Sequence, residues 1–265
     1  MNSVILFRDS LAEENECEIA AKYFNVIKYR SVIPPNSIVI GRYSVLPFYN
    51  DLCYDLFQRN CNLINSFSQH LWIANFSYYD VVKEHTFETW TDHNFHNCDY
   101  QGPFVVKGVT NSKKMNWNSL MFAKSKREAS IIACELKNDG LICSQDIIYR
   151  KYVKLKSIGV GINGLPFSNE WRFFYYKDKM IAHGFYWSLA DDKSQINDNG
   201  AIEFANTIAK IVSNYANFFV LDIAEKEKGG WILVEINDGQ MAGLSDIDIE
   251  TFYKNLKNIV NEEKN

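Results

Sequence analysis

The chain has 265 residues, of which 47% are hydrophobic, 15% aromatic and 23% charged, and its formal net charge is −4. This length and composition allow a large buried core, which excludes a disordered or fibrous protein. The small acidic excess argues against nucleic acid as a partner, but a few converging cations would still suffice to hold a phosphorylated ligand.

The cysteines and the apolar runs bear on where the protein works. Its six cysteines are scattered without a CxxC pair, so we expect reduced thiols. The N-terminal apolar run is too short for a signal peptide, and no run reaches the roughly 18 residues of a membrane span. We therefore expect a cytoplasmic protein with no membrane partner, and the oligomeric state stays open.

The first 85 residues alternate short apolar runs with helical stretches. Strands are expected near residues 4–7, 26–29, 38–40 and 61–64, and helices near 51–59 and 66–84. Such alternation predicts a small, mostly parallel sheet. The polar, aperiodic segment 86–101 that follows is expected to be a linker or lobe junction.

The next part of the chain predicts a strand, a polar loop and a well-marked helix. Ser125 and Glu128 form a capping-box pair before an apolar helical period, and Gly140 is placed to stop that helix. Further strands are expected at 103–109, 147–155, 170–176 and 180–187, and further helices near 204–215 and 252–260.

Residues 218–237 predict a β-hairpin and are the most informative stretch. A two-residue loop at Lys228-Gly229 places Asp222 opposite Glu235, and a loop at Gly229-Gly230 places it opposite Asn237. In both registers Asp222, Glu235 and Asn237 share one face, because strand side chains alternate.

Two opposed carboxylates on this hairpin require neutralisation. Their Cβ atoms would lie roughly 4.5 to 5.5 Å apart, a distance at which like charges destabilise a sheet. Carboxylate and amide oxygens suit Mg²⁺, which completes its shell with water and nucleotide phosphates. The residues Asp222, Glu235 and Asn237 therefore predict a magnesium site, and the alternative is an ordinary solvated face.

Upstream cations supply what a metal–phosphate site needs. Lys107 ends an apolar strand, Lys113 and Lys114 lie on a polar loop, and Arg172 interrupts an aromatic strand. A guanidinium can bind two phosphate or carboxylate oxygens at once, whereas lysine acts as a mobile point charge. Taken singly, each is also common as a surface cation.

These segments together resemble the ordered motifs of ATP-grasp proteins, above all a little-characterised branch found in phages and bacteria. The resemblance covers roughly residues 100–245 and rests on Pro103-Phe104-Val105-Val106-Lys107-Gly108, the strand at 147–155, Asn169-Glu170-Trp171-Arg172, Asp222, and Glu235-Ile236-Asn237-Asp238-Gly239. It implies an α+β fold in which two lobes, 86–156 and 157–265, sandwich ATP. A small α/β domain, 1–85, would precede them.

The resemblance also implies an activity. It is that of an ATP- and Mg²⁺-dependent ligase that joins a carboxylate to an amine through an acyl-phosphate, with small-molecule or peptide substrates. By the same resemblance Lys107 would hold phosphates, Lys113 or Lys114 would close over them, the backbone of Arg150, Lys151, Tyr152 and Val153 would meet adenine, Arg172 with Lys114 would be catalytic, and Asp222, Glu235 and Asn237 would bind Mg²⁺. Only Gly108 stands where many relatives have a glycine-rich lid.

Other interpretations of the same residues remain. A metal-dependent nuclease would use Asp222 and Glu235, but Asn237 stands where that arrangement needs a lysine. A catalytically degenerate nucleotide-binding module is a further alternative. The glycine pattern at 159–164 matches a dinucleotide fingerprint literally, but Pro166 follows and no helical period continues, so we set it aside.

Overall fold

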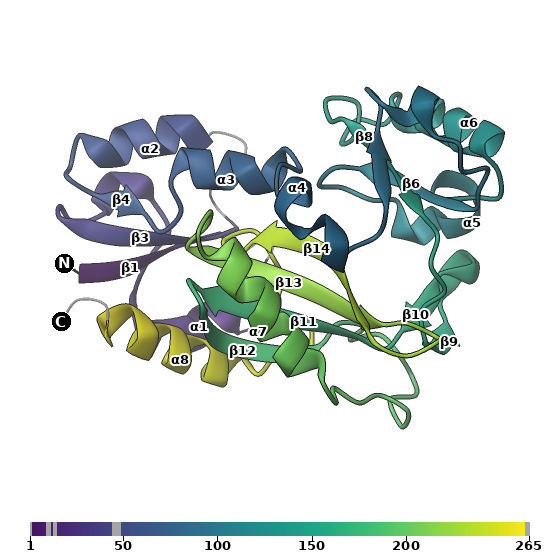
Figure 1. Cartoon of the computed structure of the whole chain (residues 1–265). Helices are drawn as coiled ribbons and strands as arrows, with labels where there is room; N and C mark the ends of the chain where they lie inside the picture. The colour runs from purple at the N-terminus through teal and green to yellow at the C-terminus, as the bar shows by residue number, and fades with distance from the viewer. Residues whose placement is uncertain (1, 9–11, 13–14, 44–48, 263–265) are drawn as a thin grey trace.

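The structure is a computed structural model that describes residues 2–8, 12, 15–43 and 49–262. The described residues build three four-stranded sheets and a two-stranded ribbon. Figure 1 shows the lobe with β6, β8, α5 and α6 standing apart at the upper right, while the other two sheets lie side by side with α8 beneath them. In this part of the chain no helix is long and apolar enough to cross a membrane.

The first sheet is parallel, with strand order β2-β1-β3-β4, as the alternation of strands and helices predicts. Its strands are β1 (Asn2–Phe7), β2 (Asn25–Ile27), β3 (Ser37–Arg42) and β4 (Asn62–Leu63), and the helices α1 (Glu16–Ala21) and α2 (Tyr49–Phe57) connect them. Short apolar runs in parallel strands, covered on both faces, account for the agreement.

The single helix expected near 66–84 is wrong. The segment forms α3 (Phe67–Ala74), α4 (Tyr79–Val82) and the 3₁₀ turn η3 (Lys83–His85). Ser66 begins α3 with a capping box to Gln69, and Phe76 breaks the helical path with a left-handed φ of 63°. A helical hydrophobic period on both sides of a break does not reveal the break.

The segment expected as a linker at 86–101 is partly a strand. Its β5 (Thr89–Thr91) pairs with β8 (Ile147–Lys151) at the edge of a second sheet, whose order is β5-β8-β6-β7. The other strands are β6 (Phe104–Gly108) and β7 (Phe122–Ala123). A three-residue strand is too short to show an alternating pattern, so only its pairing defines it.

Helix α6 (Lys126–Leu136) covers this second sheet and follows its predicted start. The Ser125 hydroxyl accepts a 3.2 Å bond from the Glu128 backbone N–H. The reciprocal bond goes elsewhere, because the Glu128 carboxylate accepts from the Lys124 N–H at 2.8 Å. The helix ends at Lys137, so Gly140 is not its stop. The short α5 (Trp117–Leu120) and the 3₁₀ turns η4 (Phe95–Asn97) and η5 (Lys114–Asn116) complete the lobe.

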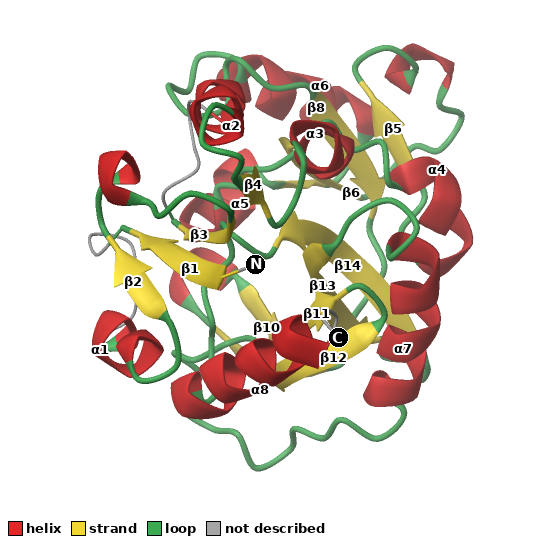
Figure 2. Ribbon diagram, turned by 90° about the vertical axis from the view of Figure 1, so that its left-hand side faces the viewer, coloured by secondary structure: helices red, strands yellow, loops and turns green. Residues whose placement is uncertain are grey.

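The third sheet is antiparallel, with order β12-β11-β13-β14. It consists of β11 (Glu170–Tyr176), β12 (Lys179–Phe185), β13 (Phe218–Glu225) and β14 (Trp231–Asp238). Alternate residues of β11 face opposite helices: Phe173 and Tyr175 pack with α7 (Ala201–Val212), and Phe174 and Tyr176 with α8 (Ile249–Glu262). Figure 2 shows these two helices along different sides of the molecule.

The segment with the dinucleotide-like glycines belongs to neither large sheet. It forms a ribbon of β9 (Ser157–Val160) and β10 (Pro166–Ser168) joined through the 3₁₀ turn η6 (Ile162–Gly164). No helix of the described chain begins there to receive a pyrophosphate, which agrees with setting that pattern aside.

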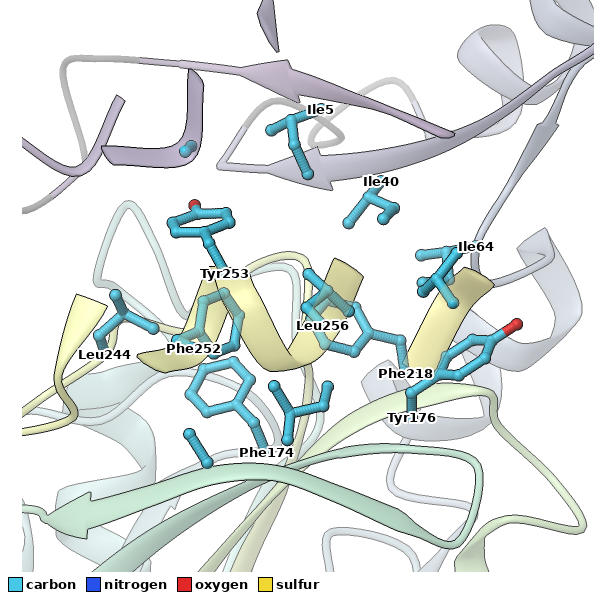
Figure 3. Close-up of a cluster of buried hydrophobic side chains, with 14 of the residues drawn as sticks. Ile5, Ile40, Ile64, Phe174, Tyr176, Phe218, Leu244, Phe252, Tyr253 and Leu256 are labelled. Carbon is cyan, nitrogen blue, oxygen red and sulfur yellow. The ribbon is translucent and has the colours of Figure 1, made fainter. Parts of the chain in front are cut away.

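The first and third sheets share one hydrophobic core, and α8 lies within it. Figure 3 shows Phe252, Tyr253 and Leu256 of α8 between Ile5 and Ile40 of the first sheet and Phe174 of the third. Each large sheet draws its strands from one of the three predicted ranges. The domain boundaries near 85 and 156 stay a prediction.

Removing the Phe252 ring should destabilise both sheets together. The side chain is fully buried, and its ring packs edge-on against Phe174 at 4.9 Å between centroids. We expect Phe252→Ala to lower the free energy of unfolding by about 3 to 5 kcal/mol in urea titrations. The exposed neighbour Lys254→Ala should change it by less than about 0.5 kcal/mol. A Phe252→Ala loss below about 1 kcal/mol would contradict the shared core.

Candidate active site

The hairpin of β13 and β14 places Asp222 directly opposite Glu235, in the first of the two predicted registers. The connection is longer than either predicted loop, since the Lys226 N–H donates to the Gly230 carbonyl across it at 2.9 Å. Gly229 and Gly230 both adopt left-handed φ values of 87° and 78°. A register shift between Asp222 and Ile223 absorbs the extra residue, so the predicted pairing survives a wrong loop.

A cation balances each of the two carboxylates. Arg172 lies opposite Asp222 on β11, and its Nε and Nη2 each donate to one carboxylate oxygen at 2.8 Å. Lys107 Nζ forms an ion pair with Glu235. The Asn237 amide donates to Asp222 at 3.2 Å. The three predicted metal ligands thus lie together, within a set of paired charges.

The Lys107–Glu235 pair joins the two lobes. Lys107 belongs to β6 of the second sheet, Glu235 belongs to β14 of the third, and the side chains are only 7% and 14% exposed. Burial opposes ionisation of Glu235, but the nearby Lys107, Arg150 and Lys114 outweigh it and hold the pKa of Glu235 below its usual value. Glu235 is therefore a charged oxygen donor at neutral pH.

The two loop lysines have different surroundings. Lys114 contacts the Tyr186 hydroxyl, and its Nζ lies 4.4 Å from the centroid of that ring. Burial disfavours its charge, yet Tyr186, Glu170 and Glu235 raise the pKa of Lys114, which stays protonated. Lys113 instead pairs with Asp139 beyond the end of α6. The structure thus holds Lys114, and not Lys113, beside Glu170 and Glu235.

Two cavities meet at this point. The smaller, of about 270 Å³, lies between the lobes and borders the segment 150–155, and the larger, of about 980 Å³, borders Arg172, Asn237 and the loop at 241–243. Ser112, Lys114 and Glu235 line both. Two ligands placed in the cavities would therefore meet beside a cation and a carboxylate.

The chain between the lobes lines the smaller cavity, as expected for Arg150, Lys151, Tyr152 and Val153. Several of its groups already have partners. Arg150 Nη1 donates to the Val234 carbonyl at 2.5 Å, and the N–H groups of Lys151 and Tyr152 donate to Glu88 and Pro103 at 2.8 and 2.9 Å. The Lys151 ammonium pairs with Glu88, so this lysine contributes backbone more than charge.

Glu170 and Tyr186 also belong to the site, although neither was assigned a role from the sequence. Glu170 lines the smaller cavity, is 4% exposed, and accepts a bond from Ser168 at 3.2 Å. Burial raises the pKa of Glu170 to about 7, against the opposing effect of Lys114. One signal was available: Glu170 precedes Arg172 by two residues in a strand, which places both on one face.

The oxygen donors fit a hard divalent cation that brings further ligands with it. Among the described residues, no three His, Cys, Asp or Glu side chains gather in a manner that could hold a metal. Asp222, Glu235 and Asn237 offer two carboxylates and one amide. That set suits Mg²⁺, which takes few protein ligands and keeps water or phosphate oxygens for the rest.

Residues 94–256 match the model of an ATP-grasp domain family, the third family of one clade of these domains. Because this match spans more than half of the sequence, the chain belongs to that ATP-grasp family. No curated protein matches the sequence. The membership agrees with the resemblance carried by the sequence motifs, and His70 and the rest of the first 93 residues lie outside the matched range.

Solved structures share the fold over nearly the whole chain. D-cycloserine synthetase DcsG has a TM-score of 0.62 and 11% identity, with 98% of this chain and 100% of that chain covered. The ATP-grasp ligase PsnB, complexed with a minimal precursor, Mg and ADP, has a TM-score of 0.56, 10% identity and coverages of 100% and 98%. A RimK domain ATP-grasp protein from Sphaerobacter thermophilus has a TM-score of 0.55, 11% identity and coverages of 95% and 98%.

The comparisons confirm the expected family and the expected α+β ATP-grasp fold. They also support the expected class of enzyme, an ATP-dependent ligase that forms C–N bonds. The roles of individual site residues remain proposals.

Glu170 should make stability depend on pH. The folded state keeps its proton up to about pH 7, whereas the unfolded chain releases it near the ordinary value of 4.5. The ionised side chain therefore costs stability above pH 7, and the cost vanishes below pH 4.5. Glu170→Gln should raise the free energy of unfolding on the order of 3 kcal/mol at alkaline pH and leave it nearly unchanged in acid.

Urea titrations of the free energy of unfolding at several pH values check this. The exposed Glu203→Gln serves as the matched control, with an expected change below about 0.5 kcal/mol. An equal effect of Glu170→Gln at both ends of the pH range would show that the buried carboxyl is not the titrating group.

Proposed function

We propose that the protein is an ATP- and Mg²⁺-dependent ligase that joins a carboxylate to an amine through an acyl-phosphate. The observation that carries this proposal is the meeting of two cavities at Lys114 and Glu235. A reaction between a nucleotide and a second substrate needs two adjoining sites and a shared, charged boundary. The ATP-grasp family membership supports the same conclusion.

The smaller cavity is the proposed nucleotide site. Its walls combine aromatic and aliphatic side chains with the extended backbone of 151–155, which suits a flat base with polar edges. The backbone of Arg150, Lys151, Tyr152 and Val153 would meet the adenine edge. The triphosphate would then extend past Lys107 towards the shared boundary.

Charged side chains at that boundary would hold the phosphates and the metal. Lys107 and Lys114 would contact phosphate oxygens, with Lys113 available from the same loop. Asp222, Glu235 and Asn237 would bind Mg²⁺, which neutralises phosphate charge when bound. The present ion pairs support this, since each carboxylate of the site has a cation beside it.

The proposed chemistry requires positioning more than a protein nucleophile. An oxygen of the substrate carboxylate attacks the γ-phosphorus, ADP leaves, and an acyl-phosphate forms. The amine then attacks the acyl carbon, and the bond to the phosphate oxygen breaks. Arg172 would stabilise the acyl-phosphate, and Lys114 would balance the charge that moves between the two phosphates.

The structural neighbours suggest the kinds of substrate. Their names include a D-cycloserine synthetase and a ligase complexed with a precursor peptide. We therefore propose a small-molecule or peptide carboxylate and an amine as substrates. We place the reaction in the cytoplasm, where free thiols persist, since all six cysteines lie in the described ranges and are free.

The two alternatives make different demands on the site. A nuclease that uses Asp222 and Glu235 needs a cation in place of Asn237, and the ATP-grasp family membership argues against it. A degenerate nucleotide-binding module would keep the smaller cavity but would not convert ATP. Neither is favoured by a particular contact in the structure.

Isothermal titration calorimetry tests the nucleotide and metal sites. We expect ATP to bind at least about tenfold more tightly with Mg²⁺ than with EDTA, and Glu235→Gln to abolish that difference, because it removes a charged oxygen donor. Glu203→Gln, on the exposed face of α7, should retain it. Binding that is indifferent to both the metal and Glu235 would remove the assignment.

Product analysis tests the reaction. Incubation with ATP, Mg²⁺ and a pool of amino acids and short peptides should release ADP and give a product lighter by one water than two inputs combined. ATP binding without any turnover across such pools would favour the degenerate module. Cleavage of plasmid DNA with Mg²⁺ and no nucleotide would favour the nuclease.

A further inference from the structure

A histidine from outside the matched family range lines the larger cavity. His70 lies on α3, and it borders the cavity together with Ile73 and Asn75. Arg172 and Asn237, assigned above to the acyl-phosphate and the metal, line the same cavity. The N-terminal part of the chain thus contributes an ionisable side chain to the space where the second substrate would lie.

Asp238 fixes the orientation of this imidazole. The His70 Nδ1 lies 3.0 Å from Asp238 Oδ2. The other oxygen, Oδ1, accepts from the Asn65 amide and from the Gln240 backbone N–H, each at 3.0 Å. A carboxylate bonded in this manner only accepts, so Nδ1 carries the proton and Nε2 carries the lone pair.

Packing prevents the ring from turning. The Tyr49 ring stacks on it at 4.1 Å between centroids with 14° between planes. The Tyr49 hydroxyl is itself fixed, since it donates to the Asn65 carbonyl at 2.8 Å and accepts from the Gln240 amide at 2.8 Å. His70 is 6% exposed, and Nε2 makes no hydrogen bond to any residue within the described ranges. Its one unpaired nitrogen is therefore available to a molecule in the cavity.

An amine substrate needs such a group. Amino groups have pKa values of about 8 to 10, so most arrive as ammonium ions without a lone pair. One proton must leave before the nitrogen can attack, and a positioned imidazole is the most frequent acceptor of such protons in enzymes. Lys114 and Arg172 cannot serve, because they line the cavity as protonated cations.

We propose that His70 is the general base of the second half-reaction and that Asp238 is its positioning residue. His70 Nε2 removes a proton from the bound ammonium group, and the freed nitrogen forms a bond to the acyl carbon. The bond from that carbon to the phosphate oxygen breaks, and phosphate leaves with its electron pair. The second nitrogen proton passes to phosphate or water, and the imidazolium returns its proton to solvent. This inference rests on the proposed ligase function.

The charged and titratable groups around His70 come from several elements. Asp238 of β14 and the Tyr49 hydroxyl of α2 contact the ring directly. Across the cavity lie Lys113, Lys114, Asp146, Arg172, Tyr186 and Glu235. A pH profile of the amide-forming step would include these groups, so a sharper test compares two nucleophiles at one pH.

Hydroxylamine separates activation of the acid from deprotonation of the amine, because it is largely uncharged at neutral pH and needs no base. The unmodified protein is given ATP, Mg²⁺ and the twenty protein amino acids, with and without hydroxylamine. Dipeptides and aminoacyl hydroxamates are then counted by mass spectrometry. For His70→Gln we expect dipeptide formation to fall about 100-fold, and hydroxamate formation to fall less than about threefold. The exposed His96→Gln is the matched control, and both products should persist.

The outcomes are distinct. An equal loss of both products in His70→Gln would show a structural or acid-binding role and would overturn the proposal, as would no loss of either. Absence of hydroxamate in the unmodified protein would count against the proposed ligase function instead of against His70.

A second measurement needs no substrate. Long-range ¹H–¹⁵N correlation spectra of the full chain report which imidazole nitrogen carries the proton. We expect the Nδ1–H tautomer for His70 in the neutral ring. An Nε2–H tautomer would overturn the proposal, because that nitrogen could then only donate.

Discussion

Two carboxylates on neighbouring strands, Asp222 and Glu235, cannot face each other in a buried sheet without cations beside them. The structure meets this constraint with Arg172 from the same sheet and Lys107 from the other lobe. Breaking one partner of a buried pair is costly because it leaves an uncompensated charge. The constraint therefore does more than stabilise a hairpin. It holds β6 of one lobe against β14 of the other, and it concentrates charge where the two cavities meet.

The N-terminal sheet helps to build the larger cavity. Arg42, fully buried at the end of β3, donates to the carbonyls of Gly239 and Ala242 at 2.8 and 3.0 Å, and Glu16 balances its charge. These bonds hold the loop that follows β14, whose residues 241–243 line the cavity. The shared core around α8 fixes the sheet that carries Arg42. The small N-terminal region thus positions a wall of the site, and α3 adds His70 to it.

The site also shows why net charge is a weak guide to ligands. The chain is acidic as a whole, with a formal charge of −4, yet Lys107, Lys114, Arg150 and Arg172 all border the two cavities. Glu170 and Glu235 balance part of that charge at close range. A bound nucleotide with its metal would replace some of these internal partners without a large change in total charge. Such an exchange is consistent with a site that is stable both with and without a ligand.

The sequence by itself determined local features: the α6 start at Ser125, the shared face of Asp222 and Glu235, and the family motifs. Each depends on backbone periodicity or on a hydrogen bond between near neighbours, which a short stretch of sequence encodes. Only the tertiary structure decided the rest. It paired Lys107 with Glu235 across 128 residues and His70 with Asp238 across 168, and it placed Lys114 rather than Lys113 beside Glu170. Those contacts depend on how sheets pack against each other, and no periodic pattern within one segment records that packing.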